Sequence, residues 1–298
     1  MRLAYFGSPA DAVAPLRALV DAGHDVALVV TQPDRRRGRG GATMPSPVKQ
    51  AALELGLDVR TPAKSREVVD EVANAGLDLA IVVAFGQLLP TALLDAVPNG
   101  FVNTHFSLLP RWRGAAPVER AILAGDGETG VCLMRIEPAL DTGPIYACER
   151  VAIGPHETAG ELRPRLVDVA TGMLVDHLPE LVRVQPAPQV GEPTYAEKLE
   201  IDEFRLDPSR DAGELVRVVR AGNPRPGAWV VIDGARTKVL RAHAVDATAE
   251  PGVIDSGAVL GTASGGLALD EVQPAGKRPM PADAWRRGHR GALRVDPS

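Results

Sequence analysis

The chain has 298 residues, of which 45% are hydrophobic, so it is long enough to form two domains with sizeable cores. Its net charge of −5 argues against a protein that binds nucleic acid over its whole surface. Two cysteines, Cys132 and Cys148, do not make a disulfide framework, and no signal peptide or apolar run of about 18 residues is visible. We therefore expect structural thiols in a reducing compartment and a soluble, cytoplasmic protein.

The first half of the chain alternates short apolar strands with helices. Strands are predicted over residues 2–6, 25–31, 58–61 and 77–84, with a further strand from residue 101, and helices over 10–22, 46–55, 65–75 and 117–123. This β-α-β order predicts a doubly wound, Rossmann-like α/β domain with a parallel sheet. The first turn, Gly7-Ser8-Pro9, lacks the Gly-x-Gly-x-x-Gly pattern, so a dinucleotide cofactor is not supported.

Residues 32–49 are predicted to form a loop that carries the densest positive charge of an acidic chain. The loop contains Arg35, Arg36, Arg37 and Arg39 and ends at Lys49. One interpretation is a solvated surface loop. The other is an arm that contacts phosphates, because guanidinium groups fit phosphate oxygens in pairs.

The second half begins with two strands, 129–136 and 145–151, which are predicted to form an antiparallel hairpin at the edge of the sheet. A long helix over 159–181 closes a first domain, residues 1–184, and the Pro-rich segment 185–205 is a linker. Residues 206–298 show one helix, 211–220, and five short strands, which predicts an OB-like β-barrel. This part carries 13 Lys and Arg against 11 Asp and Glu, whereas residues 1–205 carry 20 against 27, so contact with RNA is assigned to it.

The stretch from Phe101 to Pro117 holds the strongest candidates for catalysis. Asn103 and His105 are two residues apart on a strand, so both side chains project from the same face. An amide donor and an imidazole suit acyl chemistry, because one polarises a carbonyl oxygen and the other moves a proton. A strand-end histidine beside a turn asparagine is the alternative.

Asp141 precedes Gly143-Pro144, 36 residues after His105. A carboxylate beside a histidine can fix its tautomer, but Asp141 can equally be a turn residue. The loops after two neighbouring strands would face one crevice, where Phe85, Leu88, Leu108 and Leu109 could form an apolar slot or belong to the core.

Several motifs together resemble those of the folate-dependent formyltransferases. They are Asn103-x-His105-x-Ser107-Leu108-Leu109-Pro110, Trp112-Arg113-Gly114-Ala115-Ala116-Pro117 and Leu140-Asp141-Thr142-Gly143. The segments 6–9, 31–49, 84–90, 194–199 and 273–277 are also similar to that family, although Phe85 stands where the family usually has tyrosine. The resemblance covers nearly the whole chain.

The resemblance implies a formyltransferase domain followed by a C-terminal domain that contacts tRNA. The implied reaction transfers the formyl group of 10-formyltetrahydrofolate to the α-amino group of methionine on initiator tRNA. The implied catalytic residues are Asn103, His105 and Asp141. The folate is expected at Ser107, Leu108, Leu109, Pro110, Phe85, Gly86 and Leu88, and the tRNA at Arg35, Arg36, Arg37, Arg39 and Lys49.

Two other functions remain open at this point. One is a formyltransferase for a small amine such as an amino sugar or glycinamide ribonucleotide, which the arginine-rich loop and the C-terminal part oppose. The other is a catalytically silent RNA-binding protein, which intact Asn103, His105 and Asp141 oppose. We expect a monomer. We also expect no metal site, because no His, Cys, Asp or Glu cluster has metal-ligand spacing.

Overall fold

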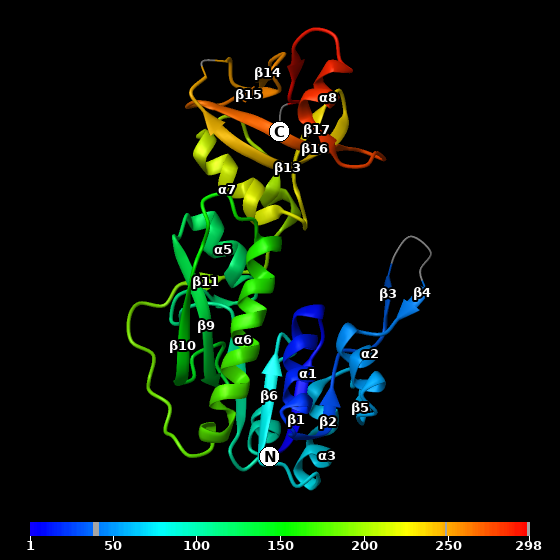
Figure 1. Ribbon diagram of the computed structural model, residues 1–298, viewed down its shortest axis with the longest axis vertical. Helices are drawn as coiled ribbons and strands as arrows, with labels where there is room; N and C mark the ends of the chain where they lie inside the picture. Colours follow the sequence, from blue (N-terminus) through cyan, green and yellow to red (C-terminus); the bar gives the residue numbers. More distant parts are fainter. Residues whose placement is uncertain (38–41, 248, 297–298) are drawn as a thin grey trace. The chain divides into compact units, whose positions relative to one another are not determined.

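The computed structural model describes residues 1–37, 42–247 and 249–296 of the chain, which divides into two compact units (Figure 1). Unit 1 consists of Met1–Gly114, Thr129–Val151 and Arg163–Tyr195. Unit 2 consists of Ala115–Glu128, Ala152–Leu162 and Ala196–Ser298. No helix within the described ranges is long and apolar enough to cross a membrane.

Unit 1 is built on a seven-stranded sheet with the order β10-β9-β7-β6-β1-β2-β5. The strands are β1 (Arg2–Gly7), β2 (Asp25–Val30), β5 (Val59–Arg60), β6 (Leu79–Val83), β7 (Phe101–His105), β9 (Glu128–Arg135) and β10 (Ile145–Ala152). The five strands from β5 to β7 are parallel, and β9 runs antiparallel to β7. The predicted Rossmann-like sheet is confirmed.

Helices connect these strands and bury both faces of the sheet. They are η1 (Ala10–Ala12), α1 (Val13–Asp21), α2 (Pro47–Glu54), η2 (Ser65–Val68), α3 (Val69–Asn74), α4 (Thr91–Leu94) and α6 (Ala159–Leu181). Alternation along β1 turns Phe6 to one face, where its ring lies 5.3 Å from the rings of Phe85 and Phe101. Tyr5 points to the opposite face, and its hydroxyl donates to the Ala12 carbonyl at 2.6 Å. Burial raises the pKa of the Tyr5 hydroxyl well above its usual value.

The strand order reverses at β1, which has β2 on one side and β6 on the other. In open α/β sheets, ligands bind outside the carboxyl ends of the strands at such a point. Here the turns that follow β1 and β6 meet, because the Ser8 hydroxyl donates to the Phe85 carbonyl at 3.2 Å. β7, which carries Asn103 and His105, lies directly beside β6.

The prediction of an irregular loop over residues 32–49 is wrong for part of the segment. β3 (Arg35–Arg37) and β4 (Ala42–Met44) pair antiparallel, with Arg35 opposite Met44. Three consecutive arginines show no alternation of apolar and polar residues, so the sequence pattern did not reveal this hairpin.

The prediction of two free thiols is also wrong, because Cys132 and Cys148 form a disulfide. The two residues are 16 positions apart but lie on neighbouring strands, Cys132 on β9 and Cys148 on β10. Strand pairing, which a cysteine count does not reveal, brings their Cα atoms to 4.1 Å.

Unit 2 contains a curled antiparallel sheet that forms half a barrel, and the C-terminal β fold is thereby confirmed. Its strands are β12 (Ala228–Ile232), β13 (Ala235–Val245), β14 (Val253–Ile254), β15 (Val259–Gly261), β16 (Gly266–Pro274), β17 (Met280–Pro281) and β18 (Leu293–Arg294). They follow the order β12-β13-β16-β15-β14-β18, with β17 beside β16. After β18 the chain returns to the first strand, since the Asp296 N–H donates to the Val231 carbonyl at 2.8 Å.

The remaining elements of the chain are short. They are β8 (Arg113–Gly114), α5 (Pro117–Ala124), β11 (Tyr195–Ala196), η3 (Ile201–Phe204), α7 (Ala212–Gly222) and α8 (Ala282–Arg287). α7 begins at Asp211, whose carboxylate accepts from the Gly213 N–H at 2.7 Å, and it packs on α5 and β13. The Arg220 side chain, on α7, donates to the carbonyls of Glu157 and Gly154 at 2.9 and 2.7 Å.

Acid should weaken the start of α6. The pKa of Glu161 is lowered to about 2, first by the Thr158 N–H that donates to it and then by its ion pair with Arg241. A carboxylate with a lowered folded-state pKa stabilises the fold above its unfolded-state pKa, and this stabilisation disappears as the pH falls toward 2. We expect the difference in unfolding free energy between the wild type and Glu161→Gln to shrink between pH 6 and pH 2. The Glu161 side chain is 47% exposed, so solvent screening should limit the difference at pH 6 to about 1 kcal/mol.

Urea unfolding at several pH values measures this difference. Glu192→Gln is the matched control, because Glu192 is exposed and has no hydrogen-bond partner among the described residues. A difference in unfolding free energy between Glu161→Gln and the wild type that stays constant from pH 6 to pH 2 would contradict the prediction.

Candidate active site

Asn103 and His105 lie on β7, in the interior of the sheet. Asn103 is opposite Val82 on β6, and His105 is opposite Cys132 on β9. The alternation of the strand places both side chains on one face, as predicted. His105 is only 5% exposed. Asn103 is half-buried, and its side-chain amide has no hydrogen-bond partner in the part of the chain that the structure describes.

The two ring nitrogens of His105 face two different oxygens. Nε2 lies 2.9 Å from the carbonyl oxygen of Trp112, and Nδ1 lies 3.7 Å from Oδ2 of Asp141. A carbonyl can only accept, so the proton of a neutral imidazole lies on Nε2. A proton that arrives at Nδ1 would lie beside the Asp141 carboxylate. The structure thus brings Asp141 next to His105, which the sequence alone did not establish.

Asp141 sits in the loop between β9 and β10 and is held by backbone contacts. Its Oδ2 accepts from the Gly114 N–H at 2.8 Å. Its Oδ1 has no donor among the described residues. Two residues on, a side chain at Gly143 would place its Cβ 1.9 Å from the Arg135 carbonyl oxygen, so only glycine allows the loop to approach β9 this closely.

These three side chains offer complementary groups to one reaction. The Asn103 amide can donate to an oxygen that becomes negative, and the free Asp141 oxygen can accept a proton. His105 lies against that carboxylate and can share the proton with it. The arrangement suits acyl transfer to an amine.

The loop residues expected to hold a folate divide into two groups. Ser107 is fully buried and its hydroxyl donates to the Arg111 carbonyl at 2.6 Å, while Leu109 packs with Cys132 and Met134. Pro110 and Leu108 are half-buried. On the β6 side, Phe85 belongs to the sheet core, whereas Gly86 is exposed and Leu88 is 79% exposed. Phe85 and Leu109 thus belong to separate apolar clusters.

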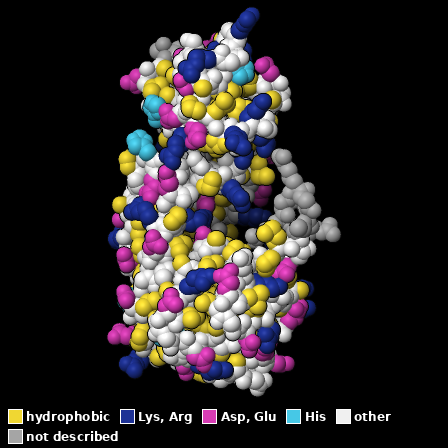
Figure 2. Space-filling view, turned by 45° about the vertical axis from the view of Figure 1, so that its right-hand side comes forward, with side chains coloured by type: hydrophobic (Ala, Val, Ile, Leu, Met, Phe, Trp, Pro, Cys, Tyr) yellow, Lys and Arg dark blue, Asp and Glu magenta, His cyan; other side chains and the backbone are white. Residues whose placement is uncertain are grey.

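The basic residues expected to bind tRNA lie on or beside the β3–β4 hairpin. Arg35 donates to the Gln32 side chain at 3.0 Å, and Lys49 forms an ion pair with Asp34 at 2.8 Å. Arg36 and Arg37 follow on β3, and Arg39 lies outside the described residues. On the face shown in Figure 2, Lys and Arg side chains are interspersed with Asp and Glu.

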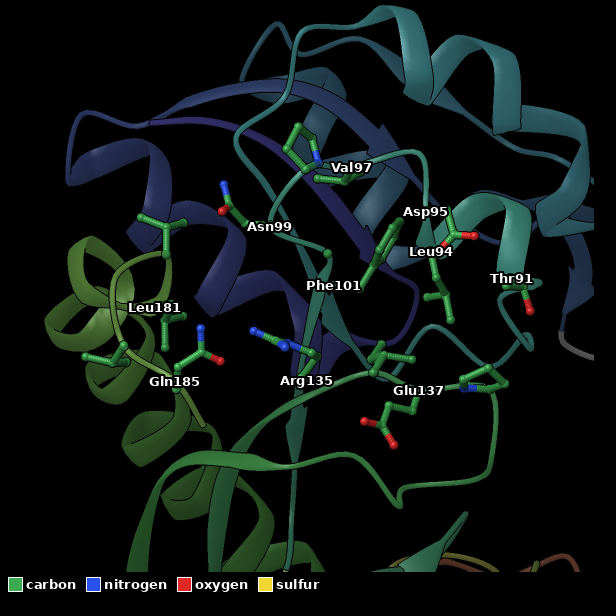
Figure 3. Close-up of a pocket in the computed structure, with 16 residues that line it drawn as sticks. Thr91, Leu94, Asp95, Val97, Asn99, Phe101, Arg135, Glu137, Leu181 and Gln185 are labelled. Atoms are coloured by element: carbon green, nitrogen blue, oxygen red, sulfur yellow. The ribbon is translucent and has the colours of Figure 1, made fainter. Parts of the chain in front are cut away.

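A cavity of about 620 Å³ in unit 1 does not include any of these site residues. It lies where β7 begins and β9 ends, whereas His105 lies at the other end of β7. Arg135, Phe101 and Gln185 are among the residues that line the cavity (Figure 3). Within the described residues, no group of three or more His, Cys, Asp or Glu side chains could hold a metal ion.

Comparison with known proteins decides the family. The formyl transferase model matches residues 1–178, and the model of the formyl transferase C-terminal domain matches residues 198–290. The chain belongs to the formyl transferase family. The resemblance seen in the sequence motifs is confirmed.

Relatives of this formyltransferase share nearly its full length. It is 44% identical to a methionyl-tRNA formyltransferase of Cereibacter sphaeroides over 291 residues, which covers 97% of this chain and 96% of the relative. It is 46% identical to a methionyl-tRNA formyltransferase of Thermus thermophilus over 295 residues, again 97% and 96%. Among solved structures, HypX of Aquifex aeolicus matches with a TM-score of 0.68 at 17% identity over 97% of this chain. This formyltransferase spans 47% of the HypX chain, about half its length, and that likeness concerns the fold.

Sequence reasoning missed Gln189, which touches the Asp141 loop, and Arg113, which donates to the Gln189 side chain. Arg113 stands inside the Trp-Arg-Gly motif, so its position there was the available signal. Gln189 lies in the segment assigned as a linker, and nothing in the sequence around it indicated a role. Its side chain donates to the carbonyls of Asp141 and Gly143, both at 2.8 Å.

Proposed function

We propose that this formyltransferase transfers the formyl group of 10-formyltetrahydrofolate to the α-amino group of methionyl initiator tRNA, which yields N-formylmethionyl-tRNA. The observation that carries the proposal is the identity of 44% and 46% to two methionyl-tRNA formyltransferases over 97% of the chain. The chemistry of Asn103, His105 and Asp141 supports it. Because the proposed product starts translation, we assign the enzyme to the cytoplasm.

Each residue of the site has a role in this reaction. The folate supplies the formyl group, and the attacking amine must lose a proton. Asn103, whose amide has no partner among the described residues, donates a hydrogen bond to the formyl oxygen as negative charge develops there. The pair formed by His105 and Asp141 takes the proton of the amine, with His105 held by the Trp112 carbonyl and Asp141 by the Gly114 N–H.

The folate is assigned to the crevice outside the carboxyl ends of the parallel strands. We assign its contacts to Ser107, Leu108, Leu109 and Pro110 on one side and to Phe85, Gly86 and Leu88 on the other. Backbone atoms must supply part of these contacts, because the Ser107 hydroxyl is engaged inside its own loop and the Phe85 ring is in the core.

Leu108→Asp should raise the KM for the formyl donor at least about tenfold, because a charge placed in an apolar contact loses its hydration. Leu53→Asp, a change at an exposed position of α2, is the control and should leave this KM unchanged. Donor titrations at saturating tRNA provide the measurement. A folded Leu108→Asp enzyme with the KM of the wild type would place the folate elsewhere.

We assign tRNA contact to the basic segment, residues 32–49, through Arg35, Arg36, Arg37, Arg39 and Lys49, and to residues 206–298. Catalysis is assigned to residues 1–184, with 185–205 as the linker, and the enzyme is proposed to act as a monomer.

Replacing Arg35, Arg36, Arg37 and Arg39 of the basic segment with glutamine should weaken tRNA use without changing the KM for folate. Each phosphate contact releases counterions, so each lost contact should reduce the slope of log affinity against log salt by roughly 0.7–0.9. The measurement is the KM for methionyl-tRNA across a salt series.

The control removes the same charge elsewhere on unit 1 by replacing Arg17, Lys64, Arg66 and Arg183 with glutamine. A variant of the basic segment whose KM and salt slope match those of this control would show that residues 32–49 are an ordinary surface segment. Contact with tRNA would then depend on residues 206–298.

The proposed function is tested by incubating the enzyme with a labelled formyl donor and one acceptor at a time. The acceptors are methionyl initiator tRNA, glycinamide ribonucleotide and a nucleotide-linked amino sugar. We expect label in the tRNA alone. Label in a small amine alone would replace the proposal with the small-amine function, and tRNA binding without transfer to any acceptor would indicate a silent RNA-binding protein.

A further inference from the structure

Gln189 lies in a segment without regular structure, yet its side chain is fully engaged. Its neighbours Pro188 and Val190 are exposed, whereas Gln189 is half-buried. Its Nε2 donates to the carbonyls of Asp141 and Gly143, both at 2.8 Å. Its Oε1 accepts from Nε and an Nη of Arg113, at 3.1 and 2.7 Å. One amide therefore joins the Asp141 loop to Arg113.

Arg113 is the first residue of β8, and the residues on either side of it in the sequence touch the catalytic groups. The carbonyl of Trp112, before it, faces Nε2 of His105, and the N–H of Gly114, after it, donates to Asp141. Gln189 is thereby anchored to the same segment, residues 112–114, that orients both His105 and Asp141.

Asp141 needs support from outside its own loop. It has a φ of 49°, in the left-handed region that a residue with a Cβ avoids at a cost of about 1 kcal/mol or more. The three residues before it, 138–140, are exposed. The hydrogen bonds from Gly114 and Gln189 therefore hold this residue in an unfavourable conformation beside His105.

We propose that Gln189, anchored by Arg113, is a positioning residue that holds Asp141 against His105 for formyl transfer. This inference rests on the proposed function, because it needs Asp141 to act in the reaction. Gln189 acts through Asp141 and does not itself take part in the chemistry. A displacement of about 1 Å at a reacting group can cost about a hundredfold in rate, so loss of the two bonds to the loop should appear in kcat.

The chemistry of this contact requires an amide. A carboxylate at position 189 would keep the hydrogen bonds from Arg113. It would place an oxygen, which cannot donate, against the carbonyl oxygens of Asp141 and Gly143. Methionine has a similar length and would lose all four hydrogen bonds without adding a charge. Gln189→Glu thus removes only the two hydrogen bonds to the Asp141 loop, and Gln189→Met removes all four hydrogen bonds.

The test measures kcat and both KM values for Gln189→Glu with methionyl-tRNA and the labelled donor. We expect kcat to fall about 10- to 100-fold while both KM values stay within about twofold. Gln185→Glu is the matched control, because it makes the same chemical change in the same segment. Figure 3 shows the Gln185 side chain at the cavity beside Arg135, and it has no hydrogen bond to the Asp141 loop among the described residues.

A double-mutant cycle separates positioning from a general structural effect. If Gln189 acts through Asp141, then adding Gln189→Glu to an Asp141→Asn enzyme should lower kcat by no more than about twofold further. A full additional 10- to 100-fold loss in that background would overturn the inference, as would a folded Gln189→Glu enzyme with the kcat of Gln185→Glu. If Gln189→Glu does not fold, Gln189→Met takes its place in the cycle with the same expectations.

The same data distinguish failure of this inference from failure of the proposed function. No transfer by the wild type to methionyl-tRNA, or full activity of Asp141→Asn, would remove the function or the role of Asp141 and the inference with it. A normal wild type and an impaired Asp141→Asn, combined with an unimpaired Gln189→Glu, would overturn the inference alone.

Discussion

Asn103→Ala is expected to lower kcat for formyl transfer by about 10²–10³-fold. The change removes one hydrogen-bond donor to the developing oxyanion, and loss of a single such donor has this magnitude. The KM for folate should change little, because the donor acts mainly in the transition state. The thermal stability should also stay the same, since the Asn103 amide has no partner to lose among the described residues.

His105→Ala should lower kcat at least as strongly, because it removes a group of the pair that takes the proton. Asn74→Ala on α3 and His177→Ala on α6 are matched controls at exposed positions and should retain full activity. Initial rates with saturating donor and methionyl-tRNA provide the measurement. Full activity in a folded Asn103→Ala or His105→Ala enzyme would remove that residue from the mechanism.

Arg286→Leu is expected to lower the unfolding free energy of unit 2 by about 3 kcal/mol or more, because it removes three hydrogen bonds that a buried, charged group donates. Arg286 is 5% exposed, and its guanidinium donates to the carbonyls of Asp255 at 2.6 Å, His289 at 3.0 Å and Gly291. No Asp or Glu forms an ion pair with it among the described residues. Its charge therefore serves to satisfy three backbone oxygens.

Arg287→Leu is the control for Arg286→Leu, because it makes the same substitution one residue further along α8. Arg287 is exposed and, among the described residues, forms an ion pair with Asp283 alone, so its loss should cost far less than the loss of Arg286. Hydrogen exchange in peptides that cover β14, β15 and β18 reports the stability of this part directly. Equal protection in the two variants would show that the buried arginine is dispensable.

Arg286 also shows why the sequence predicted some elements and missed others. Strands such as β6 and β12 were predicted because their apolar runs match their burial. α8 was missed because an arginine occupies one of its buried positions and makes the helix appear polar. Helix prediction from apolar spacing fails where a charged side chain packs inside and satisfies backbone groups.

The candidate site likewise contains residues whose positions the sequence predicted and one whose position it did not. Asn103 and His105 could be placed together because the two-residue period of a strand is a local rule. Asp141 could not be placed, because its position depends on the close approach of Gly143 to β9 and on hydrogen bonds from Gly114 and Gln189. Those contacts join distant parts of the chain, and no spacing in the sequence encodes them.

Unit 2 is made of three separate segments of the chain, and this determines how such enzymes can exchange domains in evolution or in the laboratory. Its sheet starts after residue 227, yet α7 packs on α5, and Arg220 is bound to the carbonyls of Gly154 and Glu157. A gene fragment that starts at the second family match, at residue 198, would leave these surfaces of α7 open. A chimaera that receives a foreign C-terminal module must therefore import residues 115–128 and 152–162 with it, or redesign the face of α7.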